Sequence, residues 1–270
     1  MTAPVMPTVL VTGGGVRLGA ELCRTFAQNG WRVLCQYRRS AQAAQALCQA
    51  LQDNGHDALA LEGDLNSADG RLELMTQAAA VAGPVTCLIN NASAFEPDSG
   101  IAFDDQLARE QLEVNLIAPM ALARELAAGL PPDATSGPDR LDASVIHILD
   151  QKVYNLNPDY FSYTLTKLAL ERAVALQAQA LAPRVRVCGV APGLMYPSGP
   201  QTEDNFERAC RVNLLRRGTD PADVARTCLF LAQTRSITGC TLPVDSGQHL
   251  VPLARDVMFA IDDPALKALP

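Results

Sequence analysis

The sequence is poor in aromatic residues and histidine, and it lacks any long apolar run. Aromatic residues make up 5% of its 270 residues, and there are three histidines. These histidines, at positions 56, 147 and 249, lie too far apart to form a metal-ligand pattern, so no metal is predicted. A membrane span needs about 20 successive apolar residues, and the N-terminus lacks a basic targeting segment. We therefore expect a cytoplasmic protein with no membrane partner.

Basic residues are also outnumbered. The chain has 22 Lys and Arg against 29 Asp and Glu, which gives a net charge of −7. Binding to nucleic acid requires a positive surface field, so this balance argues against a nucleic-acid partner. The eight cysteines are scattered and form no CxxC pair. Because disulfide frameworks are typical of short secreted chains, we expect reduced thiols that are mostly buried.

Short β-branched segments alternate with longer helical segments along the chain. This alternation predicts a parallel sheet with helices on both faces. We expect a single α/β domain over residues 1–270, a Rossmann-type doubly wound sheet of about seven strands. The predicted strands are Val9–Thr12, Arg32–Gln36, Ala58–Glu62, Val85–Asn90, Ser144–Leu149, Val185–Val190 and Thr241–Val244. The predicted helices are Leu18–Asn29, Ala41–Asn54, Asp69–Val81, Phe103–Gly129, Tyr160–Ala182 and Pro221–Ala232.

Two segments interrupt this alternation. Residues 131–143 are rich in Pro, Gly and Asp, which is typical of an exposed loop. Residues 192–211 are long and irregular and follow the end of a strand, where ligand-binding loops lie in open α/β sheets. We expect this second segment to be a lid over a substrate site.

The first predicted strand ends in a glycine-rich segment, and a helix follows at once. Glycines let the backbone turn sharply and approach a pyrophosphate, whose charge is met by the helix N-terminus. A glycine-rich loop without a ligand is the alternative, but the position within a β-α-β unit favours a dinucleotide site. The candidate residues are Gly13, Arg17, Leu18 and Gly19.

The end of the second predicted strand indicates which dinucleotide binds. NAD sites place an acidic residue there, which holds the ribose 2′-hydroxyl. Here the segment reads Tyr37-Arg38-Arg39-Ser40 and contains no acid. Two guanidiniums can bind an adenosine 2′-phosphate through charge-assisted hydrogen bonds. The alternative, that the arginines only hydrate a helix start, is disfavoured because the helix dipole is positive there. The sequence therefore predicts NADPH/NADP+ as the cofactor.

Tyr163 and Lys167 lie four residues apart, one turn along the same face of a predicted helix. A nearby ammonium favours a phenolate, so we expect Lys167 to lower the pKa of Tyr163 toward the working range. An ordinary surface lysine on an amphipathic helix is the alternative. The pair predicts acid–base catalysis.

In this order the motifs resemble those of the short-chain dehydrogenases/reductases from end to end. The resemblance is carried by Thr12, Gly13, Gly19, Asp64, Leu65, Asn90, Asn91, Ala92, Asn115, Tyr163, Lys167, Pro192, Gly193, Thr238, Gly239, Val244 and Asp245. It implies that Asp64 reaches the adenine and that the segment 90–92 lies along the cofactor. It also implies that Asn115 bends a helix and relays protons through water to Lys167, which holds the nicotinamide ribose. Because the family is usually tetrameric or dimeric, the resemblance implies a homo-oligomer.

The sequence departs from the family twelve to thirteen residues before the tyrosine, where most members have a serine. Those positions are Gln151 and Asp150. A carboxylate would repel a developing oxyanion, so simple alcohol or ketone chemistry is disfavoured. A carboxyl group can instead exchange a proton with a ring nitrogen. A replacement without a catalytic role is the alternative for Asp150.

The pteridine reductases and dihydromonapterin reductases resemble this chain at several separate places. These are Arg17 with Leu18 and Gly19, the segment Tyr37 to Ser40, Ser93, Phe95, Asp150, Tyr163 and Lys167. The resemblance implies a cofactor site that also includes Leu65, Asn91, Ala92, Ser93, Pro192 and Gly193. It implies a pterin held between the nicotinamide and Phe95, with Arg17 and Ser93 beside it. Loop packing for Phe95 and a cofactor-phosphate contact for Arg17 are the alternatives.

The sequence thus predicts an NADPH-dependent reductase of a C=N bond in a pterin-like heterocycle, such as a dihydropteridine or dihydrofolate. In that reaction Tyr163 and Asp150 supply the proton. One alternative is an enzyme of the same fold that acts on a carbonyl or an alcohol, with Gln151 in place of the serine. The other is an NADP(H)-binding sensor without turnover, against which the Tyr163/Lys167 pair argues. In each case the partner is a small molecule.

Overall fold

The computed structural model describes residues 6–131, 142–199 and 201–261. Within these ranges seven parallel strands form one sheet in the order β3-β2-β1-β4-β5-β6-β7. The strands are β1 (Thr8–Val11), β2 (Arg32–Tyr37), β3 (Ala58–Glu62), β4 (Cys87–Asn90), β5 (Ala143–Ile148), β6 (Val185–Pro192) and β7 (Thr241–Val244). They agree with the predicted strands except at their ends.

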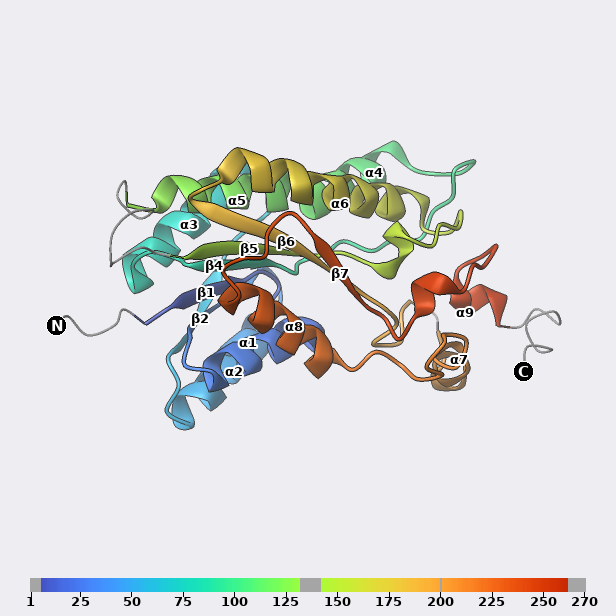
Figure 1. Cartoon of the computed structure of the whole chain (residues 1–270), viewed down its shortest axis with the longest axis horizontal. Helices are drawn as coiled ribbons and strands as arrows, with labels where there is room; N and C mark the ends of the chain where they lie inside the picture. The colour runs from blue at the N-terminus through green and yellow to red at the C-terminus, as the bar shows by residue number, and fades with distance from the viewer. Residues whose placement is uncertain (1–5, 132–141, 200, 262–270) are drawn as a thin grey trace.

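Helices cover both faces of the sheet. The α-helices of the described residues are α1 (Arg17–Gln28), α2 (Ala41–Asp53), α3 (Ala68–Ala82), α4 (Asp105–Leu112), α5 (Ala118–Gly129), α6 (Phe161–Leu181), α7 (Glu203–Ala209), α8 (Pro221–Gln233) and α9 (Val257–Ala260). Helices α1, α2 and α8 lie on one face, and α3 to α6 lie on the other (Figure 1). The predicted Rossmann-type α/β fold is confirmed. No described helix is both long and apolar enough to cross a membrane.

The alternation of side chains along the strands explains the two helical layers. On β1, Val9 and Val11 belong to the hydrophobic cluster that contains Phe26 of α1. Leu10 points to the opposite face and packs in the cluster of Leu122 from α5. Each of these side chains is fully buried, and burying one stabilises the fold by about 1.5–3 kcal/mol. Strand β1 therefore packs against both helical layers.

The order of the strands creates the place for a site. β1 lies between β2 and β4, so the chain leaves β1 toward one edge of the sheet and later returns to its other side. The chain after β1 leads to a helix on one face of the sheet, and the chain after β4 leads to helices on the other face, which leaves a crevice at the carboxyl ends of these strands. The glycine-rich turn follows β1, and the segment 91–95 follows β4.

The predicted helix Phe103–Gly129 differs from the structure in two ways. It begins at Asp105, because the Asp104 carboxylate caps the helix by accepting from Leu107 N at 2.8 Å. It is also interrupted by one π-helical turn, Glu113–Ile117, which contains Asn115. The helix is therefore irregular at Asn115, and the bend that the resemblance implied there stays a prediction.

The two irregular segments also have different outcomes. Residues 192–211 contain helix α7, so the prediction that the whole segment is irregular is wrong. This helix begins where Thr202 Oγ1 accepts from Asn205 N at 3.3 Å. In the other segment, residues 132–141 lie outside the described residues, and Ala143 already belongs to β5.

Candidate active site

The glycine-rich turn lies against the start of α1. Gly13 has a φ of +61°, and its N–H donates to Gln36 Oε1 at 2.8 Å. A Cβ at Gly19 would lie 2.1 Å from the Gly13 carbonyl oxygen. The turn is therefore accessible only to glycine at these two positions. It brings the backbone close to the N-terminus of α1, where Leu18 is buried.

Arg17, the first residue of α1, turns toward the predicted lid. Its Nη2 donates to the Pro197 carbonyl at 3.4 Å, and its guanidinium lies 5.7 Å from the centre of the Tyr196 ring. Arg17 thus joins the glycine-rich turn to the segment that follows β6. Pro192 ends β6, and the Gly193 N–H donates to the Val244 carbonyl of β7 at 3.0 Å.

The ends of β1 and β4 are joined through Thr12 and Asn91. Thr12 Oγ1 accepts from Asn91 N at 2.9 Å and from Ala92 N at 3.0 Å. Asn91 Nδ2 donates in return to the Thr12 and Gly13 carbonyls at 2.9 and 3.2 Å. These bonds fix the segment 91–93 against the glycine-rich turn. The predicted cofactor residues from these two loops therefore lie together.

The predicted 2′-phosphate site lies at the ends of β2 and β3. Tyr37 is buried, whereas Arg38 and Arg39 are exposed and Ser40 precedes α2. Arg38 forms an ion pair with Asp64, at 3.6 Å from Nη1 to Oδ1. Leu65 beside it is buried. The two arginines are therefore accessible from solvent.

Asp150 and Tyr163 form a direct hydrogen bond. The Tyr163 hydroxyl donates to Asp150 Oδ2 at 2.9 Å, while Asp150 Oδ1 accepts from Lys152 N at 2.9 Å. Burial raises the pKa of Asp150, and the Lys152 N–H and the charges of Lys152 and Lys167 oppose that rise. Because the carboxyl group and the phenol are hydrogen-bonded, the two groups titrate as a coupled pair.

Lys167 does not act on the tyrosine as the spacing predicted. Its Nζ donates to the Ile148 carbonyl at 2.8 Å and lies 5.7 Å from the centre of the Tyr163 ring. Burial lowers the pKa of Lys167 to about 8, opposed by the charge of Asp150. Burial and the neighbouring Asp150 raise the pKa of Tyr163 well above its usual value. The prediction of a lowered pKa for Tyr163 is therefore wrong, and the phenol keeps its proton.

Asn115 is fully buried and bridges two elements. Its Oδ1 accepts from Ala94 N at 2.8 Å and from Ser93 Oγ at 3.1 Å. Its Nδ2 donates to the Ala94 carbonyl at 2.8 Å and to Thr166 Oγ1 of α6 at 3.1 Å. Asn115 thereby holds the segment after β4 against α6. A proton relay through this residue stays a prediction.

Phe95 lies beside the candidate catalytic tyrosine. Its ring stacks on Tyr160 with centroids 4.2 Å apart and an interplanar angle of 20°. It meets Tyr163 edge to face, with centroids 4.6 Å apart. Three aromatic rings therefore form one wall, which we call the aromatic wall: Phe95, Tyr160 and Tyr163.

A cavity of about 480 Å³ brings these groups together. Its lining includes the sequence-predicted residues Gly13, Arg17, Leu18, Gly19, Asn91, Ala92, Ser93, Phe95, Asp150, Tyr163, Lys167, Pro192 and Gly193. It also includes residues that the sequence did not suggest: Lys152, Gln201, Gln248, Asp256 and Met258. Lys152 comes from the loop after β5, Gln201 from the predicted lid, and the other three from the C-terminal part of the chain; no motif marks them. The predicted residues Tyr37, Arg38, Arg39, Ser40, Asp64, Leu65 and Asn115 lie outside the lining.

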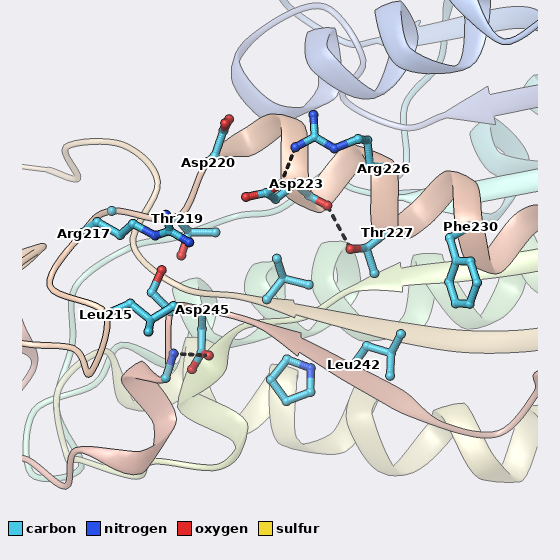
Figure 2. A pocket seen from close by; sticks show the side chains of 15 residues that line it. Leu215, Arg217, Thr219, Asp220, Asp223, Arg226, Thr227, Phe230, Leu242 and Asp245 are labelled. Atoms are coloured by element: carbon cyan, nitrogen blue, oxygen red, sulfur yellow. Dashed lines mark hydrogen bonds and ion pairs between the residues drawn. The ribbon is translucent and has the colours of Figure 1, made fainter.

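A second cavity, of about 810 Å³, lies elsewhere, between α8 and the edge strand β7. Figure 2 shows Arg226 and Asp223 on α8 above it, with Phe230 and Leu242 at its far end. Its lining contains neither Asp150 nor Tyr163. The larger cavity is therefore not the place where the candidate catalytic groups meet.

Known proteins resemble this chain over most of its length. Residues 7–208 match the family model described as short chain dehydrogenase. Pteridine reductase 1 of Leishmania tarentolae is 28% identical, over 92% of this chain and 98% of its own length. Dihydromonapterin reductase of Klebsiella pneumoniae is 27% identical, over 90% and 96%. The crystal structure of FolM alternative dihydrofolate reductase 1 from Brucella canis, complexed with NADP, is similar with a TM-score of 0.86 and 38% identity, over 94% and 98% of the two chains.

Proposed function

The chain belongs to the short-chain dehydrogenase family, and on that premise we propose that it is an NADPH-dependent reductase of a C=N bond in a pterin-like heterocycle. The observation that carries the proposal is the Asp150 carboxyl bonded to the Tyr163 hydroxyl at 2.9 Å. A dihydropteridine or dihydrofolate is the expected substrate. The names of the three similar proteins above support this substrate class.

The residues present fit an NADP(H) cofactor. The left-handed backbone at Gly13, and the lack of a Cβ at Gly19 that lets α1 begin directly against the Gly13 carbonyl, keep the turn compact, so that a pyrophosphate would meet the N-terminus of α1. Arg38 and Arg39 are exposed at the end of β2, where they would hold the 2′-phosphate. Asp64, beside Arg38, would reach the adenine. When bound, the cofactor supplies the hydride.

In the proposed reaction the protein supplies the proton. Tyr163 keeps its proton because burial and Asp150 raise its pKa. The phenol and the Asp150 carboxyl together can therefore deliver a proton to a ring nitrogen as hydride arrives at the neighbouring carbon. The Lys167 ammonium, 3% exposed, would stabilise the negative charge that remains on the pair.

The aromatic wall suits a flat substrate. Phe95 stacks with one face on Tyr160, and aromatic rings favour offset stacking with other flat rings. Ser93 and Arg17 line the same cavity and would meet the polar edge of the heterocycle. The segment 192–211 would close over it, which the contacts of Arg17 with Pro197 and Tyr196 support.

The test is anaerobic oxidation of NADPH by the purified protein. Dihydrobiopterin, dihydromonapterin and dihydrofolate are compared with a panel of ketones. Turnover with the pterins alone is expected, because a carboxyl group opposes an oxyanion but can serve a ring nitrogen. Turnover with ketones alone would overturn the proposal and favour the carbonyl alternative. The alcohol form of that alternative has one observation behind it, since Gln151 lines the cavity and its Oε1, a buried acceptor without a partner, would accept from an alcohol hydroxyl.

We also propose that the protein is a homo-oligomer. Phe230 of α8 is 51% exposed beside the edge strand β7. Arg226 and Asp223 form an ion pair with each other on the same helix (Figure 2), so a two-fold copy of this face would place a second such pair beside the first. Light scattering after size-exclusion chromatography should give a dimer or tetramer, and Phe230→Glu should dissociate it. A monomeric wild type would contradict this proposal.

We infer a cytoplasmic location from the thiols. All eight cysteines are free, and all but Cys240 are buried. Such thiols persist in a reducing compartment. Fractionation of cells that express the protein at native level tests this inference, and recovery from a secreted fraction would overturn it.

A further inference from the structure

We propose that Lys152 is a positioning residue of the active site, whose buried ammonium ties the C-terminal segment 255–259 to the catalytic loop and keeps a positive charge beside the Asp150–Tyr163 pair. The catalytic loop is residues 150–160. The proposal rests on the proposed function for its effect on the rate. Its effect on Asp150 itself can be measured without any substrate.

Lys152 is held by an unusual set of contacts for a lysine. It is 2% exposed, and its Nζ donates to Asn157 Oδ1 at 2.9 Å and to the Asp159 carbonyl at 3.1 Å. The third bond runs to Asp256 Oδ2 at 2.9 Å. Its backbone N–H donates to Asp150 Oδ1. One residue thus contacts the candidate acid through its backbone and the C-terminal segment through its side chain.

The C-terminal segment is attached to the same loop at further points. Asp256 N donates to Asp159 Oδ2 at 2.7 Å, and Arg255 pairs with that carboxylate at 2.8 Å. The Tyr160 hydroxyl donates to Met258 Sδ at 3.3 Å. Asp256 and Met258 line the substrate cavity, so the segment forms part of its wall. Lys152 is the buried charge at the centre of this attachment.

Burial makes the Lys152–Asp256 pair sensitive to the loss of either partner. A buried charge that loses its counter-charge is strongly destabilising, whereas a complete pair is tolerated.

Three charged side chains act on the Asp150–Tyr163 pair: Lys152 from the loop, Lys167 from α6 and Asp256 ahead of α9. The lysines favour the carboxylate, and Asp256 raises the pKa of Tyr163.

Lys152 and Asp256 therefore have opposite electrostatic effects on the Asp150–Tyr163 pair. Removing Lys152 leaves Asp256 and takes a positive charge away, so Asp150 and Tyr163 should hold their proton more tightly. Removing Asp256 leaves the charge of Lys152 uncompensated, so Asp150 and Tyr163 should release their proton more easily. A role confined to packing would give no such reversal, because both changes would loosen the same segment.

The first experiment measures the Asp150 carboxyl directly. Infrared titration of protein labelled with 13C-aspartate, assigned by comparison with Asp150→Asn, follows that group without substrate. Lys152→Met should raise its apparent pKa by roughly one unit, and Asp256→Asn should lower it by a similar amount. Lys152→Arg should leave the pKa of Asp150 close to its wild-type value, because it keeps the positive charge. Arg124→Met, which removes an exposed cation paired with Glu125, is the matched control and should leave the titration unchanged.

The second experiment measures the reaction. The alkaline limb of the pH profile of kcat/KM should move to higher pH for Lys152→Met and to lower pH for Asp256→Asn. KM for the pterin should rise in both, because the cavity wall is released, while the affinity for NADPH stays within about threefold. Shifts in the same direction, or no shift, would overturn the proposal. If the wild type reduces no pterin, the proposed function has failed, and the infrared titration still decides the role of Lys152. If Lys152→Met does not fold, Asp256→Asn and Lys152→Arg carry the test.

Discussion

The Tyr163 hydroxyl donates a hydrogen bond of 2.9 Å to Asp150 Oδ2, which joins a residue at the end of β5 to the first turns of α6. Both groups are more basic than usual, since burial raises the pKa of each. A phenol in this setting is an acid that stays protonated at neutral pH. The pair therefore suits proton delivery better than proton abstraction.

We expect Asp150→Asn to reduce pterin turnover by roughly 100-fold or more, because the amide can no longer exchange the proton. The affinity for NADPH should stay near that of the wild type. Steady-state kinetics and cofactor fluorescence measure the two quantities. Gln151→Ala is the matched neighbour and should retain activity. The reverse pattern, with activity lost in Gln151→Ala and kept in Asp150→Asn, would favour carbonyl chemistry.

Tyr163→Phe removes the hydroxyl and keeps the ring that meets Phe95 edge to face. We expect turnover to fall by roughly 100- to 10,000-fold, the usual contribution of a positioned general acid. Cofactor binding should be nearly unchanged, because the glycine-rich turn and the two arginines at the end of β2 are untouched. Single-turnover kinetics under saturating NADPH give the clearest reading. Retained turnover would exclude Tyr163 as the proton donor.

Replacing Arg38 and Arg39 by alanine should weaken NADPH binding much more than NADH binding. Each lost charge-assisted hydrogen bond costs about 1.5–3 kcal/mol, so the double variant should lose roughly 100-fold or more in affinity for NADPH. Titration calorimetry with both cofactors at two salt concentrations measures this. Equal losses for the two cofactors would contradict the 2′-phosphate assignment.

His147 should make the protein less stable in mild acid. It is fully buried in β5, with Nδ1 3.1 Å from Asn90 Nδ2 and Nε2 2.9 Å from Gln177 Oε1. Burial lowers its pKa from 6.5 to about 4. Because the folded value lies below the unfolded one, the stability is fully present above pH 6.5 and is lost as pH falls toward 4. The loss between pH 7.5 and 4.5 should be about 2–3 kcal/mol.

Urea unfolding of the wild type and of His147→Gln at these two pH values tests the histidine. The glutamine variant should lose less stability on acidification, although it starts from a lower value. His56→Gln, at a half-buried loop position, is the control and should follow the wild type. Parallel pH dependence in wild type and His147→Gln would show that another group titrates.

Much of the fold follows from local patterns. The alternation of apolar strands and helices determines a parallel sheet because each segment must bury one or two apolar faces, as Val9 and Leu10 do on opposite sides of β1. Helix α7 was not predicted from these patterns. It is short, and Phe206 is its single large apolar residue, so its pattern has no clear helical period.

By itself the sequence determined the chemical groups at the site and most of their neighbours. Gly13 and Gly19, Arg38 and Arg39, and the pair of Tyr163 and Lys167 are recognisable because their spacing is set by one strand, one turn or one helix. The tertiary structure decided how those groups behave. The pKa of Tyr163 rises instead of falling, because of burial and the placement of Asp150. Lys152 meets Asp256 across 104 residues, a contact that no local pattern could indicate. Desolvation and charge interactions act through space, so they are determined only when the folded chain brings distant segments together.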